Sequence, residues 1–409
     1  MTIGFVENHR KKESGAGEPF ESFGPVESAR ARRFHRSFRE YSPTPLVFFP
    51  ALSRRLGLGE IMLKDESTRF GLNSFKVLGA SYAIGRFMAK KLGRPIESLS
   101  LEILASPDVR AKIGETLFVT ATDGNHGRGV AWTVARLGHK AMVFMPKGSA
   151  DIRANAIRVI GAKCVVTDFD YDDSVHLAER YARENGGALV QDTAWEGYET
   201  IPRWIMQGYM TLIDEVLEQI RNRDKLPPTH MFLQAGVGSF AGAILGHCVA
   251  ALGNDAPKTL LVEPRNAACI HRSMECADGF PHKAADMAQT IMAGLACGEP
   301  CSIAWGILRD YAAGALSCPD FIAANGMRIL ASPLFGDPQV VSGESGAVGC
   351  GVLEYLMSAP EGRKIARRLG LDAASRVLLI STEGDTSPEI YRKIVHYGAY
   401  PDPGRGVFE

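Results

Sequence analysis

Strand-like and helix-like segments alternate from residue 117 to residue 191, and this alternation constrains the fold more than any other feature of the sequence. Short runs rich in β-branched and aromatic residues are separated by helical stretches of about ten residues, each stopped by a glycine. The pattern is typical of a parallel, doubly wound α/β unit. The strand-like runs are 117–120, 141–145, 164–167 and 188–191, and the helical stretches are 130–137, 152–160 and 174–185.

A second α/β series follows later in the chain, which predicts two domains with a cleft between them. We place the larger domain at residues 1–76 and 190–409 and the smaller domain at 77–189. The first 45 residues mix charge, glycine and proline, and we expect them to form an arm over the surface. The strand-like runs of the second series are 231–234, 259–262 and 376–380.

The charge balance excludes several classes of partner. The chain has 409 residues, with 46 Lys and Arg against 46 Asp and Glu, which argues against nucleic-acid binding and a polybasic membrane patch. No apolar run reaches the roughly 18 residues that span a bilayer. Residues 1–12 lack the apolar core of a secretion signal, and the eight cysteines show no metal-ligand spacing. We therefore expect a cytoplasmic protein with free thiols and no metal site.

Lys76 lies between a small polar turn and an apolar helical stretch that begins at Val77. A lysine in an apolar setting is poorly solvated, which lowers its pKa and makes its amine a nucleophile able to form a Schiff base. The alternative is a surface lysine whose stem lies over apolar neighbours.

Three loops follow strand-like runs and carry polar or glycine-rich sequence, at 120–127, 234–242 and 381–385. In the second, converging backbone amides and a helix N-terminus favour an anion such as phosphate. Because ligands collect outside the carboxyl ends of strands in open α/β sheets, we expect the loops and Lys76 to meet in one crevice. Together they fit an aldehyde cofactor with a phosphate tail, pyridoxal 5′-phosphate (PLP).

Sequence segments along most of the chain carry a resemblance to a known family. They are LKDESTRFG (63–71), FK (75–76), TATDGNHGRG (120–129), VQDTAWEGY (190–198), TIMAGLACGEP (290–300) and SGESGAV (342–348). In content and order they resemble the fold type II, tryptophan-synthase-β-like PLP enzymes, and among these most closely the diaminopropionate ammonia-lyase family. The resemblance implies two doubly wound, three-layer α/β domains with the PLP cleft between them. Ser387 departs from it, since an aspartate is expected there.

The resemblance also implies a set of site residues. Lys76 would hold PLP, Asn125 would hydrogen-bond the ring O3′ oxygen, and Ser381 would face the pyridine nitrogen. Glu344 would line the ring edge. The cradle for the phosphate would be the backbone of Gly236, Val237, Gly238 and Ser239.

The implied reaction is an α,β-elimination that converts 2,3-diaminopropionate, as both D and L enantiomers, to pyruvate and two ammonia through aminoacrylate. Lys76 would take the Cα proton of the L-substrate, and Asp123, on the opposite face, that of the D-substrate. Asp123 and Asp192 would supply an acidic pocket for the cationic β-amine. Asp192 bonded to local backbone amides, and Asp123 capping a helix, are the structural alternatives. We expect His126 to be structural.

Other functions remain open at this point. A serine or threonine dehydratase would share Lys76 and the loops but carry a small neutral residue in place of Asp123. An NAD-dependent oxidoreductase would use the glycine-rich loop with Glu263 as the ribose-binding acid. A PLP carrier without catalysis is the third alternative. The resemblance further suggests a homodimer that acts on a small amino acid, and whether Cys269 and Cys297 pair is left open.

Overall fold

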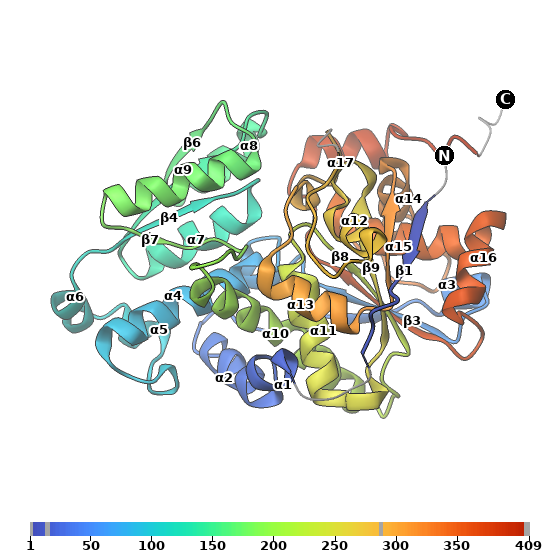
Figure 1. Ribbon diagram of the computed structural model, residues 1–409, viewed down its shortest axis with the longest axis horizontal. Helices are drawn as coiled ribbons and strands as arrows, with labels where there is room; N and C mark the ends of the chain where they lie inside the picture. The colour runs from blue at the N-terminus through green and yellow to red at the C-terminus, as the bar shows by residue number, and fades with distance from the viewer. Residues whose placement is uncertain (1–2, 13–16, 286–288, 405–409) are drawn as a thin grey trace.

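The computed structural model describes residues 3–12, 17–285 and 289–404, and its strands form two separate sheets (Figure 1). The large sheet has seven strands, of which the five central ones are parallel and the two at the edges, β1 and β2, run antiparallel to their neighbours. In spatial order they are β1 (Gly4–Glu7), β10 (Gly314–Cys318), β9 (Lys258–Pro264), β8 (His230–Gln234), β11 (Arg376–Ser381), β3 (Glu60–Asp65) and β2 (Leu46–Phe48).

The small sheet has four parallel strands and lies on the left in Figure 1. Its strands overlap the four runs predicted from residue 117 onward, which confirms the parallel α/β pattern. All of them fall within the proposed smaller domain, whose boundaries stay a prediction. In spatial order they are β6 (Lys163–Val166), β5 (Lys140–Met145), β4 (Leu117–Ala121) and β7 (Ala188–Leu189).

Hydrophobic cores lie on both faces of each sheet. Because successive side chains of a strand point to opposite faces, each central strand contributes to two cores. In β8, Met231 and Leu233 belong to one hydrophobic core and Phe232 to another. In β5, Phe144 belongs to one core of the small sheet and Val143 to the other. Strands buried on both faces read as continuous apolar runs, which explains why they are recognisable in the sequence.

The helices cover these faces and connect the strands. They are α1 (Glu18–Ser22), α2 (Pro25–His35), α3 (Pro50–Leu56), α4 (Lys76–Leu92), α5 (Leu101–Leu104), α6 (Pro107–Ile113), α7 (Asn125–Arg136), α8 (Asp151–Arg158), α9 (Tyr171–Glu184), α10 (Thr200–Arg221), α11 (Ser239–Leu252), α12 (Cys269–Cys276), α13 (Ser302–Tyr311), α14 (Asp320–Ala331), α15 (Glu344–Ser358), α16 (Pro360–Leu369) and α17 (Pro388–Val395). The 3₁₀ turns are η1 (Arg69–Gly71), η2 (Ile96–Ser98), η3 (Gly253–Asp255), η4 (Arg265–Ala267) and η5 (Ala293–Leu295).

The expectation of a surface arm over the first 45 residues is wrong for the part that the structure describes. Strand β1 extends the large sheet, and Phe23, Phe34 and Phe38 are buried in its core. Burying aromatic side chains is strongly favourable, so these three outweigh the charged residues around them.

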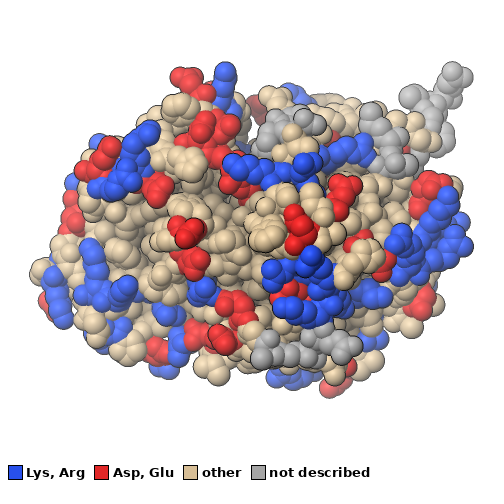
Figure 2. All heavy atoms as spheres, in the orientation of Figure 1, with Lys and Arg blue, Asp and Glu red and all other residues tan. Residues whose placement is uncertain are grey.

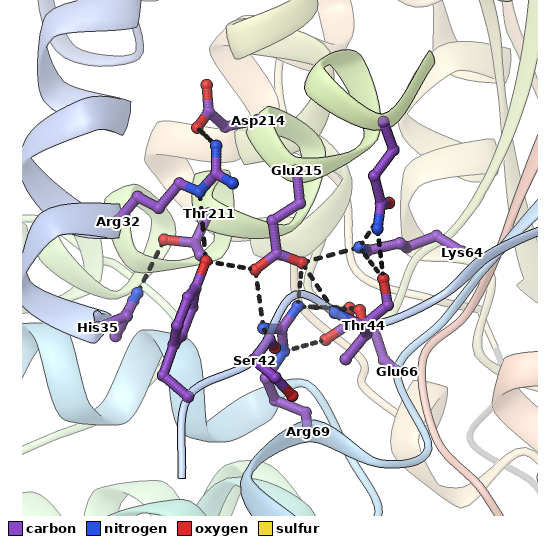
Figure 3. Close-up of polar contacts among 12 residues, drawn as sticks. Arg32, His35, Ser42, Thr44, Lys64, Glu66, Arg69, Thr211, Asp214 and Glu215 are labelled. Carbon is purple, nitrogen blue, oxygen red and sulfur yellow. Dashed lines mark hydrogen bonds and ion pairs between the residues drawn. The ribbon is translucent and has the colours of Figure 1, made fainter. Parts of the chain in front are cut away.

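A buried charged cluster, Lys64, Glu66, Arg69 and Glu215, ties β3 to α10 next to the segment that precedes Lys76 (Figure 3). Lys64 Nζ lies 2.7 Å from Glu215 Oε2, and Arg69 Nη2 lies 2.7 Å from the same oxygen and 2.8 Å from Glu66 Oε1. Two cations thus balance two anions in a site closed to water.

Acidic and basic side chains are interspersed over the face shown in Figure 2, as the equal numbers of the two in the sequence lead one to expect. Among the helices within the described ranges, none is long and apolar enough to cross a bilayer. Within the same ranges, no three His, Cys, Asp or Glu side chains gather as metal ligands would.

Candidate active site

One cavity collects the loops that follow the carboxyl ends of β4, β8 and β11, together with the start of α4. The carboxyl ends of parallel strands lie at one edge of each sheet. Loops from this edge of both sheets line the same cavity. The predicted residues that line the cavity are Lys76, Asp123, Asn125, His126, Asp192, Gly236, Val237, Gly238 and Ser239.

Lys76 is the first residue of α4, and its Nζ forms an ion pair with Asp192. Burial disfavours the charged amine, but the charge and hydrogen bond of Asp192, together with Tyr209 and Asp123, outweigh burial and raise the pKa of Lys76 above its usual value. The expectation of a lowered pKa is therefore wrong for the cofactor-free chain. The group that contributes most to the raised pKa of Lys76 is the carboxylate of Asp192, which lies 116 residues away in the sequence.

Asp192 lies between Lys76 and His126. Burial opposes its charge, but Lys76 and then His126 lower the pKa of Asp192 to about 2. His126 Nε2 donates to the carbonyl of Val190 at 2.8 Å, which leaves Nδ1 facing Asp192 Oδ2 at 3.9 Å. Burial lowers the pKa of His126, and its hydrogen bond to Val190 braces the loop, in keeping with the structural role expected for it.

Asp123 stands in the loop after β4, with its Oδ2 atom 3.5 Å from Arg153 Nη1. Arg153 lies on α8 and also donates from Nε to Ser387 Oγ at 3.0 Å. Asp123 therefore has a partner of its own, Arg153, although it lines the same cavity as Lys76 and Asp192.

Asn125 opens α7, and its Nδ2 donates to Glu383 Oε2 at 2.5 Å. Glu383 follows β11 in the large sheet and also lines the cavity. This contact joins the two sets of loops across the crevice, and the sequence did not predict it.

The glycine-rich loop after β8 has the properties of an anion cradle. Within the described residues, the backbone amides of Gly236, Val237 and Gly238 donate no backbone hydrogen bond, and α11 begins directly after them. A Cβ atom at Gly236 would lie 3.2 Å from the Cys297 sulfur, which is a tight contact, and Gly238 has a φ of +92°, so both positions favour glycine. The free amides and the helix N-terminus fit a phosphate.

Two predicted residues do not line the cavity. Ser381 is buried at the end of β11 and its hydroxyl donates to Ser342 Oγ at 2.7 Å. Its neighbour Thr382 faces the cavity instead, because successive residues of an extended chain point in opposite directions. Glu344 is also buried outside the lining, where burial and then the charge of Glu383 raise its pKa to about 7.

Unpartnered polar atoms show what the cavity is built to hold. His126 Nδ1, Gln234 Oε1 and Ser345 Oγ are buried without a partner among the described residues, and all three residues line the cavity. Buried polar groups normally have partners, so these atoms indicate a polar ligand. An amine, an anion cradle and an amide next to them fit PLP.

Glu263, the acid required for the NAD-dependent alternative, does not face the cavity. It is fully buried, and its two carboxylate oxygens accept the backbone amides of Ile270 and His271 at 2.8 and 2.6 Å. Both acceptors are used to cap α12, so Glu263 is not placed to bind a ribose.

Comparisons with known proteins identify the family and its cofactor. Residues 38–382 match the family described as pyridoxal-phosphate dependent enzyme. A diaminopropionate ammonia-lyase of Salmonella typhimurium is 52% identical over 392 residues, which cover 96% of this chain and 97% of that protein. The Escherichia coli diaminopropionate ammonia-lyase in complex with D-serine is 44% identical with a TM-score of 0.91. The same enzyme with an aminoacrylate–PLP azomethine reaction intermediate is 45% identical with a TM-score of 0.89, and both comparisons cover 98% of each chain.

Proposed function

This chain belongs to the pyridoxal-phosphate dependent enzymes and, within them, to the diaminopropionate ammonia-lyases, and from that membership we propose how its residues convert 2,3-diaminopropionate to pyruvate and two ammonia. The observation that carries the proposal is a cavity in which Lys76 pairs with Asp192 while a second carboxylate, Asp123, pairs with Arg153. Two carboxylates suit a substrate with a second, cationic amine. A serine or threonine substrate has no such charge to recognise.

We assign the cofactor contacts to the residues that line the cavity. Lys76 would bind the aldehyde carbon of PLP, the backbone from Gly236 to Ser239 its phosphate, and Asn125 its ring oxygen. Thr382 replaces Ser381 as the partner of the pyridine nitrogen, and its hydroxyl is fixed by Gln234 Nε2 at 3.0 Å. When bound, PLP supplies an electron sink that weakens the bond between the substrate Cα and its hydrogen.

Two bases serve the two enantiomers in this proposal. The Lys76 amine takes the Cα proton of the L-substrate, and Asp123 takes that of the D-substrate from the opposite side. A base must lie within hydrogen-bond reach of the proton that it removes, so one side chain cannot serve both faces well. The separate partners of Lys76 and Asp123 support this division of labour.

The β-amine leaves as a neutral molecule only if it carries its extra proton until the carbon–nitrogen bond breaks. Asp123 and Asp192 stabilise this ammonium group through their negative charges. After the first ammonia departs, the remaining three-carbon fragment takes up one water and releases the second ammonia with pyruvate.

Three further properties belong to the proposal. We expect both D- and L-diaminopropionate to be substrates, the chain to form a homodimer, and the enzyme to act in the cytoplasm. The first follows from the two bases. The homodimer rests on the family resemblance, and the cytoplasmic location rests on the eight cysteines, all of which are free thiols in the structure.

The test is product release by the PLP-loaded protein from D- and L-diaminopropionate, L-serine and L-threonine, measured side by side. We expect two ammonia per pyruvate, with diaminopropionate turned over far faster than serine or threonine. A preference for serine or threonine would mean that Asp123 and Asp192 are structural and that the chain is a dehydratase.

A further inference from the structure

The carboxylate of Glu383 makes three contacts at the edge of the cavity. It accepts a hydrogen bond from Asn125 Nδ2 at 2.5 Å, from the backbone amide of Ser345 at 3.2 Å and from Thr386 Oγ1 at 3.3 Å. Ser345 lies in the first turn of α15, where the helix N-terminus favours a negative group. Glu383 is buried, so these contacts hold its side chain in one position.

An asparagine side chain presents an oxygen or a nitrogen to the cavity, depending on which way its amide is turned. A carboxylate accepts hydrogen bonds but donates none when it is charged. Glu383 therefore accepts only the nitrogen end of the Asn125 amide. One hydrogen of Nδ2 is used in this bond, and the second remains for an acceptor in the cavity.

The neighbouring acid supports this arrangement. Glu344 is buried close to Glu383, and burial together with the charge of Glu383 raises the pKa of Glu344 to about 7. Two adjacent buried carboxyl groups do not both carry charge easily. Glu383, which holds three hydrogen-bond donors, is the better placed of the two to remain the acceptor.

We propose that Glu383 is a positioning residue that turns the Asn125 amide so that its nitrogen donates to the ring oxygen of the cofactor. The inference rests on the proposed PLP function and adds a residue that acts on the cofactor through Asn125. Glu383 also links the two sheets, because Asn125 begins α7 beside the small sheet while Glu383 follows β11 of the large one.

The test uses Glu383→Gln, which keeps the shape of the side chain but accepts either end of an amide. PLP is titrated into the purified full-length protein without substrate, and the dissociation constant and the absorbance band of the bound cofactor are recorded. We expect PLP to bind about five- to tenfold more weakly, the scale of one ordinary hydrogen bond, with a shifted band. The matched control is Asp385→Asn, the same change in the same turn, where Asp385 contacts Asn73 rather than Asn125.

A double-mutant cycle separates positioning from a general loss of structure. If Glu383 acts through Asn125, then Glu383→Gln weakens PLP binding in the wild type but adds nothing further to Asn125→Ala. Additive losses, or equal PLP binding by the wild type and Glu383→Gln, would overturn the inference. A wild type that binds PLP but does not consume diaminopropionate would remove the proposed function and leave the cycle on Glu383 valid, so the two failures are distinguishable.

Discussion

Three charged side chains line the cavity: Lys76 and Asp192, which pair with each other, and Asp123, which pairs with Arg153. These partners determine the protonation chemistry of each side chain. Asp192 forms an ion pair with Lys76, whose positive charge lowers the pKa of the Asp192 carboxyl to about 2. Asp123 pairs with Arg153 instead. The two acids of the cavity therefore have different cationic partners, Lys76 for Asp192 and Arg153 for Asp123.

Replacing Asp123 with Asn removes a base without a large change of shape. We expect turnover of D-diaminopropionate to fall by about 10²- to 10⁴-fold, the usual contribution of a general base, while turnover of the L-enantiomer changes much less. Steady-state kinetics on both enantiomers, with PLP content checked by absorbance, measure the difference. Equal losses on the two enantiomers at full PLP content would contradict the assignment.

Asp192→Asn tests the Lys76–Asp192 ion pair through the pH dependence of the unfolding free energy, measured in cofactor-free protein. The pKa of Asp192 in the folded chain is about 2, against an ordinary 3.8. An acid whose pKa is lowered by folding stabilises the fold above its unfolded pKa and loses that contribution as the pH falls toward the folded value. The contribution is about 2 kcal/mol, from the size of the shift.

We therefore expect Asp192→Asn to be less stable than wild type at pH 6, and the gap between them to narrow as the pH falls from about 4 toward 2. Unfolding free energies from urea titrations at several pH values measure the gap. A gap that stays constant over this range would show that the Asp192 charge does not stabilise the fold.

At the scale of single elements, the buried charged cluster fixes β3 against α10 just before the turn that leads to Lys76 (Figure 3). The turn contains Phe70 and Asn73 with φ of 50° and 57°, which are unfavourable for residues other than glycine. Arg69 lies next to Phe70 and donates to both Glu66 and Glu215. The cluster thus holds a strained turn in place.

Lys64→Met leaves two buried carboxylates to share one arginine. We expect it to cost about 3–5 kcal/mol of stability, as when one partner of a buried pair is removed. The double variant Lys64→Met/Glu215→Gln restores the balance with Arg69 and Glu66 and should be more stable than Lys64→Met alone. Urea unfolding of both variants measures this, and a double variant at least as unstable as the sum of its parts would contradict charge balance as the cause.

The elements that the sequence predicted are those with a local signal. The strands of the small sheet are apolar on both faces and are separated by glycine-stopped helices, so each is visible by itself. Strand β1 and the aromatic residues of the first helices went unrecognised because their partners lie far along the chain: Phe5 pairs with Leu316. Short edge strands have little sequence signal of their own.

The same distinction applies to the site. Lys76, Asn125 and the glycine-rich loop stand in contiguous motifs and line the cavity as predicted, although their roles toward PLP stay proposals. Thr382 lines the cavity and Ser381 does not, because side chains alternate in direction at the end of β11. A prediction that is off by one residue therefore selects a side chain on the wrong face. The raised pKa of Lys76 depends on Asp192, which no local pattern near the lysine reveals.

At the scale of the whole molecule, the cavity is closed by contacts between the small-sheet region and the segment that follows β11. Besides Asn125 with Glu383, Arg153 on α8 donates to Ser387 at 3.0 Å, and both residues are buried. These contacts hold the two sheets at a fixed separation. The resemblance to the family leads one to expect an aspartate at Ser387, so here Arg153 donates to a neutral hydroxyl where an ion pair is expected.

Ser387→Asp tests how much this contact contributes. A carboxylate facing Arg153 makes a charge-assisted bond, and we expect about 1–2 kcal/mol of added stability with slower hydrogen exchange in α8. Ser387 also precedes α17 as its N-cap residue, where aspartate is itself favourable. The control is Ser387→Asn, which caps the helix equally well but carries no charge. Because only the carboxylate strengthens the contact with Arg153, protection of α8 should rise in Ser387→Asp and not in Ser387→Asn; equal protection in both would assign the effect to the cap of α17 and not to the link between the sheets.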